Sequence, residues 1–179
     1  QIGVGFFPET IHLGDGVFKT IQPENIRKFH PNLIVNATGS GPLLPPINGL
    51  MDNIDKEGGN VYSILGMISH INDFPQDLEG KKIAVIGAVG LDVVEFFAAR
   101  KADISIVEMM DQIGRDLDPV TKNDTKCMMK SHDVHQLTKT ALLEVKADSF
   151  LVKGSEGEYE LPFDYGFVCL GMRAKGQLY

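Results

Sequence analysis

A short strand–glycine–helix segment, residues 81–97, has the residue types that could hold a dinucleotide. The apolar run Ile83–Ile86 leads into Gly87, and a helix-like segment begins near Leu91. Such turns bind phosphate because glycine lets the backbone come close and because amides at a helix start attract anions. The full motif, G-x-G-x-x-G, has three glycines, whereas this turn keeps only Gly87 and Gly90 and is two residues shorter. The shortening predicts a compact turn whose pyrophosphate site is weakened or empty.

The two remaining glycines fit the first and third positions of that motif. The first permits the tight turn, and the third lets the helix pack closely on the strand. Ala88 and Val89 lie between Gly87 and Gly90, where their side chains narrow the path of a phosphate. A plain strand-to-helix turn without a ligand is the alternative that these residues leave open.

An acidic residue stands where the ribose of a bound nucleotide would lie. Glu108 ends the next apolar strand, about 20 residues after Gly87. A carboxylate at this place can accept hydrogen bonds from both hydroxyls of the adenosine ribose, and it repels a 2′-phosphate. No arginine stands nearby in "VEMM" to attract that phosphate, so NADH is favoured over NADPH. The alternative is a solvated acid at the end of a strand.

These residues require a strand–helix–strand unit to position them. The helix predicted over 91–101 has one apolar face, formed by Val93, Val94, Phe97 and Ala98. "DISIVEM" is the second strand, and the crossover predicts a parallel pair. A second helix is expected within 118–132, with Asp118 or Thr121 as its N-cap.

The flanking segments complete an α/β pattern. Before the unit we expect a helix at 23–30, a buried strand at 33–37 that ends at Gly39, a proline-rich extended connector at 40–50 and a short helix at 60–71. After it, residues 140–171 alternate as short strands, with a hairpin turn at "KGSEG" and a last strand, "YGFVCLG", that ends in Gly171.

Composition excludes several function classes. The 179 residues carry a net charge of −7 and no long basic run, which disfavours nucleic acid and anionic membranes as partners. No apolar stretch is long enough to span a bilayer, and the cytoplasm is the expected location. Cys127 and Cys169 form no C-x-x-C pair and no metal-ligand set. The chain begins without methionine, which points to a piece of a longer protein.

Four motifs then occur in one order: "NLIVNATGSGPLLPPINGL", "GKKIAVIGAVG", "DISIVEMMDQIGRDLDPVTKNDT" and "FDYGFVCLGMR". This order resembles the C-terminal portion of the NADH:flavin oxidoreductases of the old yellow enzyme superfamily, of the 2-enoate reductase and 2,4-dienoyl-CoA reductase type. The resemblance covers the chain from about Ile11 to Tyr179, and "IGRDLDPVT" after a "VEM" strand is its most specific part.

The resemblance implies a Rossmann-like, three-layer α/β nucleotide-binding domain with a parallel sheet, inserted in a truncated second FAD/NAD(P)-binding domain. It implies a partial FAD-type lobe at 1–55, an NAD(P)H-binding domain at 56–165 and a return segment at 166–179. The cofactors would be NAD(H) and FAD, whereas FMN and a 4Fe–4S cluster would belong to missing parts of the parent. Members of the resembled family form assemblies, so the resemblance is compatible with a homo-oligomer.

The resemblance also assigns roles to residues. Ala37, Thr38 and Gly39 would approach FAD, and Gly171 would close the nicotinamide side. Asp92 stands where the family usually has a glutamate near the nicotinamide. The residues that would hold the NADH adenosine and pyrophosphate are Gly87, Ala88, Val89, Gly90 and Glu108.

Some positions depart from the family pattern. Lys101 and Asp133 replace glycines, and a left-handed backbone at Lys101 would be unfavourable by about 1 kcal/mol. Asn48 replaces a common proline, and the segments for the FAD adenosine half are absent.

Three functions follow as hypotheses. The first is the NADH-binding and partial FAD-binding fragment of an oxidoreductase that passes hydride from NADH to FAD and on to an activated C=C bond, inactive by itself. The second is a degenerate domain that holds ADP or serves as a scaffold. The third, a flavin-linked disulfide reductase, is disfavoured because no paired-cysteine motif is present.

Overall fold

The computed structural model describes residues 10–12, 18–20, 27–28, 30, 32–33 and 39–174. It divides into two compact units, residues 1–41 with 173–179 and residues 42–172. In the smaller unit, β1 (Thr10–His12) pairs antiparallel with β2 (Phe18–Thr20). The helix expected over 23–30 and the strand expected over 33–37 lie mostly outside the described residues.

The chain enters the larger unit at the end of β3 (Ser40–Pro42) and leaves it at the start of β12 (Met172–Ala174). These two strands are neighbours and pair with each other. The Leu43 N–H donates to the Gly171 carbonyl at 2.8 Å, which continues this pairing. Residues 43–47 then run without regular structure, as the prolines of the connector predict.

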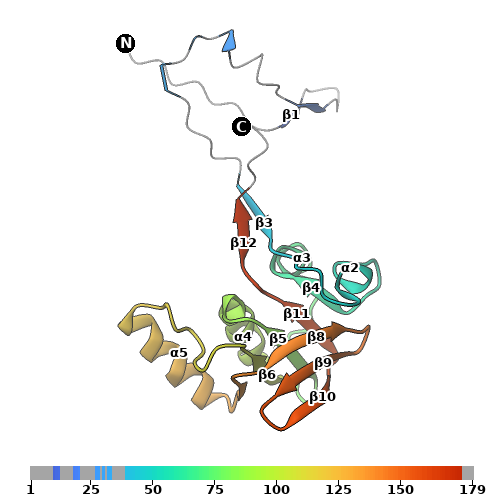
Figure 1. Cartoon of the computed structure of the whole chain (residues 1–179), viewed down its shortest axis with the longest axis vertical. Coiled ribbons are helices and arrows are strands. Elements are labelled where there is room, and N and C mark those ends of the chain that lie inside the picture. The colour runs from blue at the N-terminus through green and yellow to red at the C-terminus, as the bar shows by residue number, and fades with distance from the viewer. Residues whose placement is uncertain are drawn as a thin grey trace. The chain divides into compact units, whose positions relative to one another are not determined.

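A five-stranded parallel sheet forms the centre of the larger unit (Figure 1). Its order is β4-β11-β5-β6-β7, and every neighbouring pair is parallel. The strands are β4 (Val61–Ser63), β11 (Tyr165–Val168), β5 (Lys82–Ile86), β6 (Asp103–Val107) and β7 (His135–Leu137). The predicted α/β class with a parallel Rossmann-like sheet is therefore confirmed.

Alternation along the strands produces two cores, one on each face of the sheet. Ile83 and Val85 of β5 face the helices, together with Phe97 and Val93, and all four are nearly or fully buried. Ala84 and Ile86 face the other side. There they pack in a second buried cluster whose members include Leu50, Val145, Phe150 and Val152. This three-layer arrangement is the physical reason that the strands read as continuous apolar runs.

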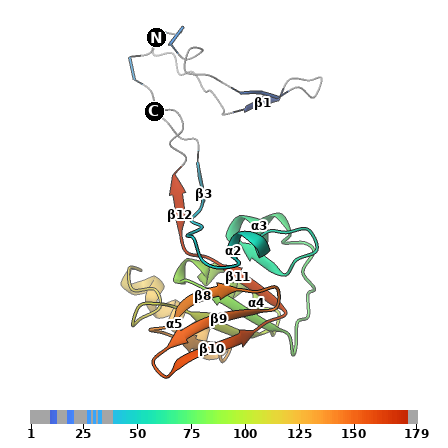
Figure 2. The same cartoon turned by 45° about the vertical axis from the view of Figure 1, so that its right-hand side comes forward.

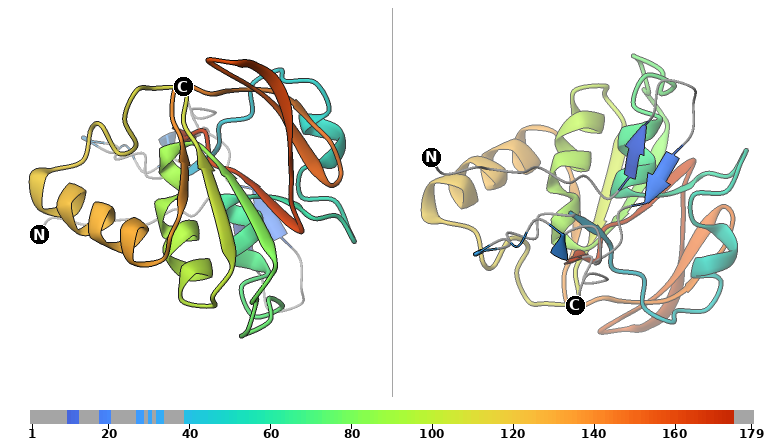
Figure 3. Two further views of the ribbon diagram at one scale, coloured as in Figure 1. Left: turned by 90° about the horizontal axis from the view of Figure 1, so that it is seen from below. Right: turned by 90° about the horizontal axis from the view of Figure 1, so that it is seen from above.

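Helices cover one face and antiparallel strands cover the other (Figure 3, left panel). The helices on the first face are α3 (Ile64–Ser69), the 3₁₀ turn η1 (Ala88–Gly90), α4 (Leu91–Ala98) and α5 (Pro119–Ser131). The short helix α2 (Leu50–Asn53) lies on the other face, where Leu50 packs with Val145 and Phe150 of the antiparallel strands. The strands β8 (Ala141–Val145), β9 (Ser149–Gly154) and β10 (Gly157–Pro162) form a meander, which Figure 2 shows lying against the parallel sheet.

Most element predictions agree with the structure, and one is wrong in part. The short helix expected over 60–71 begins only at Ile64, because Val61–Ser63 pairs with β11 as an edge strand. The Ser63 hydroxyl then accepts from the Gly66 N–H at 3.0 Å and caps the helix. The hairpin at "KGSEG" forms as expected, with Gly154 opposite Gly157.

Both long helices end in a left-handed residue that is not glycine. Lys101 has φ +62° after α4, and Asp133 has φ +51° after α5. The Ala102 N–H donates back to the Phe97 carbonyl at 3.3 Å, and the Val134 N–H donates to the Met129 carbonyl at 2.9 Å. These bonds close a Schellman-type end that glycine usually provides.

None of the helices in the described ranges is both long and apolar enough to cross a membrane.

Candidate functional site

The candidate site lies where β5 ends and α4 begins. β5 is in the middle of the sheet, because the chain moves from it to β6 on one side while β11 flanks it on the other. A ligand of an open parallel sheet binds at such a point, outside the carboxyl ends of the strands. The backbone turns there through Gly87 into η1 and α4.

Gly87 is required by its conformation and by its neighbour. Its φ is +92°, in the left-handed region that L side chains rarely adopt. A Cβ on Gly87 would lie 2.4 Å from the Cys169 carbonyl oxygen at the end of β11. The backbone of the turn therefore approaches β11 more closely than any side chain permits, as predicted for the first glycine of the motif.

Gly90 is required by packing. A Cβ there would lie 2.4 Å from Cγ1 of Val85 and 3.1 Å from Sγ of Cys169. Glycine thus lets the start of α4 rest directly on β5 and on the residue that follows β11. This is the role predicted for the third glycine.

Glu108 contacts the turn directly. Its Oε2 accepts a hydrogen bond from the Ala88 N–H at 3.0 Å, and its Oε1 accepts from the Met110 N–H at 2.9 Å. The backbone of Glu108 is also fixed: its N–H donates to Leu137, and its carbonyl accepts from Thr140. Four hydrogen bonds therefore hold this half-buried residue between the ends of β5, β6 and β7.

The ribose end of a dinucleotide fits this arrangement. A carboxylate has about four lone-pair positions, and the two bonds on Glu108 leave room for ribose hydroxyls to donate. The pyrophosphate end does not fit the turn as it stands. The Ala88 N–H, the first amide of the helical run, already donates to an anion of the protein itself.

A groove of about 510 Å³ borders the other side of the turn. Ala88, Val89 and Asp92 line it together with residues of α5, including Thr121 and Asp124. Asp92 lies in the first turn of α4, as predicted, and Val89 is half exposed beside it. Since its charged lining residues, Asp92, Glu95 and Asp124, are all acidic, the groove adds negative potential near the turn.

The two cysteines are not a redox pair. Cys169 is buried against Gly87 and Gly90, and its burial raises the pKa of the thiol to about 12, with a smaller contribution from Asp92. Cys127 is exposed on α5. Cys169 thus acts as a small packing residue.

The remaining predicted residues are not brought to this turn by any described contact. Gly171 has φ +115° and bonds through its carbonyl to Leu43. Gly39, with φ +82°, belongs to the smaller unit. Ala37 and Thr38 lie outside the described residues.

Sequence reasoning missed several residues of the site, among them Cys169, Met110 and the groove residues that α5 contributes. Cys169 packs against both Gly87 and Gly90. The backbone N–H of Met110 donates to the Glu108 carboxylate, and Leu117 lines the groove. The order of the strands would have indicated Cys169, because the residue after β11 meets the residue after β5 in a parallel pair. No sequence signal identifies Met110, since only its backbone amide is used.

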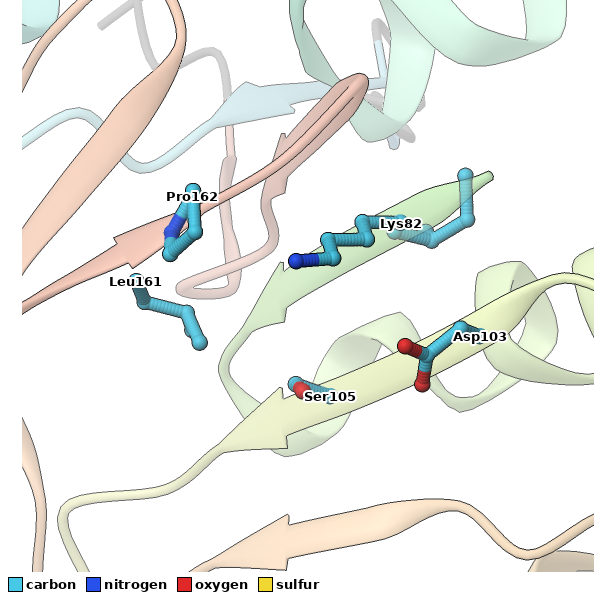
Figure 4. Close-up of a pocket in the computed structure, with 6 residues that line it drawn as sticks. Lys82, Asp103, Ser105, Leu161 and Pro162 are labelled. Carbon is cyan, nitrogen blue, oxygen red and sulfur yellow. The ribbon is translucent and has the colours of Figure 1, made fainter. Parts of the chain in front are cut away.

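A second, smaller recess of about 120 Å³ lies at the opposite end of the strands (Figure 4). Lys82 of β5 and Asp103 and Ser105 of β6 face Leu161 and Pro162 of β10. Lys82 and Asp103 begin their strands, so this recess is remote from the carboxyl edge. Among the described residues, no group of three or more His, Cys, Asp or Glu could hold a metal ion.

Comparison with known proteins gives a family and several relatives. The sequence profile of the pyridine nucleotide-disulphide oxidoreductases matches residues 10–179. A bilirubin reductase of Mediterraneibacter gnavus is 25% identical over 91% of this chain and 24% of its own length. An NADH oxidase of Thermoanaerobacter brockii is 27% identical over 79% of this chain and 21% of its own length. The chain therefore spans about a quarter of the length of the curated relatives it matches.

Among solved structures, a 2-naphthoyl-CoA reductase superposes on 89% of the chain and 23% of its own length. The TM-score is 0.71 at 19% identity, so the likeness is one of fold.

Proposed function

Because this chain belongs to the pyridine nucleotide-disulphide oxidoreductase family, we propose that it is the NADH-binding and partial FAD-binding piece of a flavin-dependent oxidoreductase. The family match supports FAD and NAD(P) as the cofactors. NADH as the preferred nucleotide is our proposal, and the assignment of 56–165 to NADH, and of 1–55 and 166–179 to an FAD-type lobe, is part of it.

One observation carries this proposal: Glu108 lies at the carboxyl end of β6, with its carboxylate directly beside the glycine turn. That position suits the two hydroxyls of an adenosine ribose, and the negative charge opposes a 2′-phosphate. The name of the Thermoanaerobacter brockii relative, an NADH oxidase, supports the same nucleotide.

The parent protein, on this proposal, belongs to the old yellow enzyme type. In that parent, NADH would supply the hydride and FAD would be its acceptor, so that the electrons could reduce an activated C=C bond of an enoate or dienoyl-CoA. The substrate pocket would lie outside these 179 residues, so the chain alone would not turn over.

Calorimetric titration of the 179-residue chain with NADH, and separately with NADPH, tests the proposal. We expect NADH to bind more tightly than NADPH. Glu108→Ala should weaken the binding of NADH, because the ribose hydroxyls lose their hydrogen-bond acceptor. It should also reduce the difference in affinity between NADH and NADPH, because the 2′-phosphate is no longer repelled by a carboxylate. Equal affinity of the unaltered chain for NADH and NADPH would contradict the proposed specificity.

A matched control is Glu95→Ala. Glu95 lies in the acidic groove beside the turn but has no described hydrogen bond to it. The Glu95→Ala substitution changes the net charge of the chain by the same amount as Glu108→Ala. If both variants alter NADH binding equally, the effect is one of overall charge, and the ribose role of Glu108 is wrong.

A second candidate function is a nucleotide-binding domain that has lost its cofactor and serves as a scaffold. The hydrogen bond between Ala88 and Glu108 favours it, because the protein's own carboxylate occupies the phosphate-binding amide. Absence of binding by NADH, ADP and adenosine would favour this candidate over the first.

A further inference from the structure

We propose that Glu108 is an intramolecular competitor of phosphate, which latches the shortened turn by holding the Ala88 amide. This inference rests on the proposed function only in its choice of nucleotide probes. It concerns the affinity that the diphosphate adds to a nucleotide, and not the recognition of ribose. Its consequence is that the chain selects nucleotides by their adenosine end and gains little from their phosphates.

The first step of the argument is geometric. The Ala88 N–H is the first amide of η1, and η1 continues into α4 as one helical run. Amides at this position are the donors that a pyrophosphate takes in the full motif. Here the distance from the Ala88 nitrogen to Oε2 of Glu108 is 3.0 Å, which is a complete hydrogen bond.

The second step is that Glu108 is fixed in this position. Its other carboxylate oxygen is bonded to Met110, and its backbone is bonded to Leu137 and Thr140. A side chain whose two carboxylate oxygens are both bonded, on a backbone that is itself bonded on both sides, does not swing away freely when a ligand approaches. A phosphate that takes the Ala88 amide must therefore break a charge-assisted bond within a rigid arrangement.

The third step is electrostatic. A diphosphate at Ala88 would lie next to the Glu108 carboxylate and near Asp92 and Glu95, which line the groove on the other side of the turn. The residues that line this groove include no lysine, arginine or histidine to offset those charges. Like charges at such separations oppose binding even where solvent screens them.

The fourth step concerns the shortening itself. The turn lacks the two residues that include the middle glycine of the full motif. Ala88 follows Gly87 directly, and Gly87 is anchored to β6 by its N–H bond to Val107, the residue before Glu108. Because the turn is two residues shorter than the full motif, the first helical amide, that of Ala88, lies within hydrogen-bonding distance of Glu108.

Calorimetric titration of the full chain with adenosine, ADP and inorganic pyrophosphate tests the latch. In the unaltered chain we expect ADP and adenosine to bind with affinities within about threefold of each other, and pyrophosphate not to bind, because the phosphates gain no free amide. In Glu108→Gln, which removes the charge and keeps the shape, we expect the ratio of ADP affinity to adenosine affinity to rise about tenfold.

Ala88→Pro provides the matched variant, because proline has no N–H to donate. Gly87 has ψ 140°, the extended value that a residue before proline prefers, and proline is well tolerated in the first turn of a helix. In the double variant Ala88→Pro, Glu108→Gln we expect the gain in the ADP to adenosine ratio to disappear. Circular dichroism and thermal melting establish that each variant is folded.

Three results would overturn the latch. The first is an unaltered chain that already binds ADP about tenfold more tightly than adenosine. The second is a ratio that Glu108→Gln leaves unchanged. The third is a gain that persists in the double variant. If the unaltered chain binds neither NADH nor adenosine, the proposed function fails instead. Binding of pyrophosphate to Glu108→Gln alone would then still support the latch.

Discussion

The two helices that follow β5 and β6 begin in opposite ways. At α5, Asp118 caps the helix from the adjoining position: its carboxylate accepts from the N–H groups of Val120 and Thr121 at 3.0 and 3.1 Å. At α4 no side chain from the neighbouring sequence caps the helix. The first amide of that run is instead bonded to Glu108, which lies beyond the next strand.

This difference shows how one physical need is met locally or through the fold. The first amides of any helix lack partners within the helix. A cap residue at the start of α5 satisfies two of them and can be read from sequence. The start of α4 has no local cap, and a carboxylate that is distant in the sequence takes that place.

The largest expected effect comes from breaking the start of α4 at its first glycine. Gly87→Ala forces a side chain into a left-handed conformation and against the Cys169 carbonyl, so we expect a loss of about 3 kcal/mol in the free energy of unfolding, measured by urea denaturation. Gly80→Ala is the control, because Gly80 also has a positive φ, +78°, but open space at its Cβ. A loss at Gly80 as large as at Gly87 would show that conformation alone, and not the close approach, makes Gly87 necessary.

The next effect comes from removing the distant cap. Glu108→Ala deletes the acceptor of two backbone amides, so we expect a loss of about 1–2 kcal/mol in the free energy of unfolding. Glu108→Gln keeps one oxygen acceptor and should lose less. Hydrogen exchange at the Ala88 and Met110 amides reports the same change locally. Unaltered protection of the Ala88 amide in Glu108→Ala would contradict the bond.

Removing the local cap of α5 sharpens the comparison. We expect Asp118→Ala to lower the melting temperature by about 2–4 °C, whereas Asp118→Asn, which can still cap, should lower it less. The hydrogen bonds from Thr121 hold the pKa of Asp118 below its ordinary value. A lowered pKa stabilises the fold above the pKa of the unfolded chain, and this contribution is lost as the pH falls through the folded pKa. The gap between the unaltered chain and Asp118→Ala should therefore narrow in acid, and a gap independent of pH would contradict the charged cap.

The smallest effect extends the comparison to the helix ends. Lys101→Gly should raise the free energy of unfolding by up to about 1 kcal/mol, because glycine adopts the observed φ of +62° without strain. Asp133→Gly should gain less, since aspartate tolerates this conformation better than lysine. Thermal melts of the two variants measure the difference, and a larger gain at Asp133 would contradict this ranking.

Much of the larger unit follows from its sequence. The apolar runs at β5 and β6, the buried face of α4 and the Asp118 cap are local patterns, and the structure has all of them. The strand at Val61–Ser63 was not predictable in this way. Its three residues become a strand only because β11, about a hundred residues later, supplies the partner.

The candidate site divides in the same manner. Spacing identified Gly87, Gly90 and Glu108 as members of one site, and the contacts around the turn bring them together. Spacing did not reveal that the Glu108 carboxylate bonds to Ala88, because that bond depends on the register of β5 against β6. It also did not reveal Cys169, which reaches the glycines only through the position of β11 beside β5.

The sequence by itself thus determined the class of fold, the place of the turn and the residue types that meet there. These features depend on side-chain periodicity and on residue types at short spacing, which act locally. Only the tertiary structure decided what the turn does with its first amide. That outcome depends on a carboxylate and an amide brought within 3.0 Å by two parallel strands. The sequence predicted a compact turn, and the fold supplied the anion that occupies its first amide.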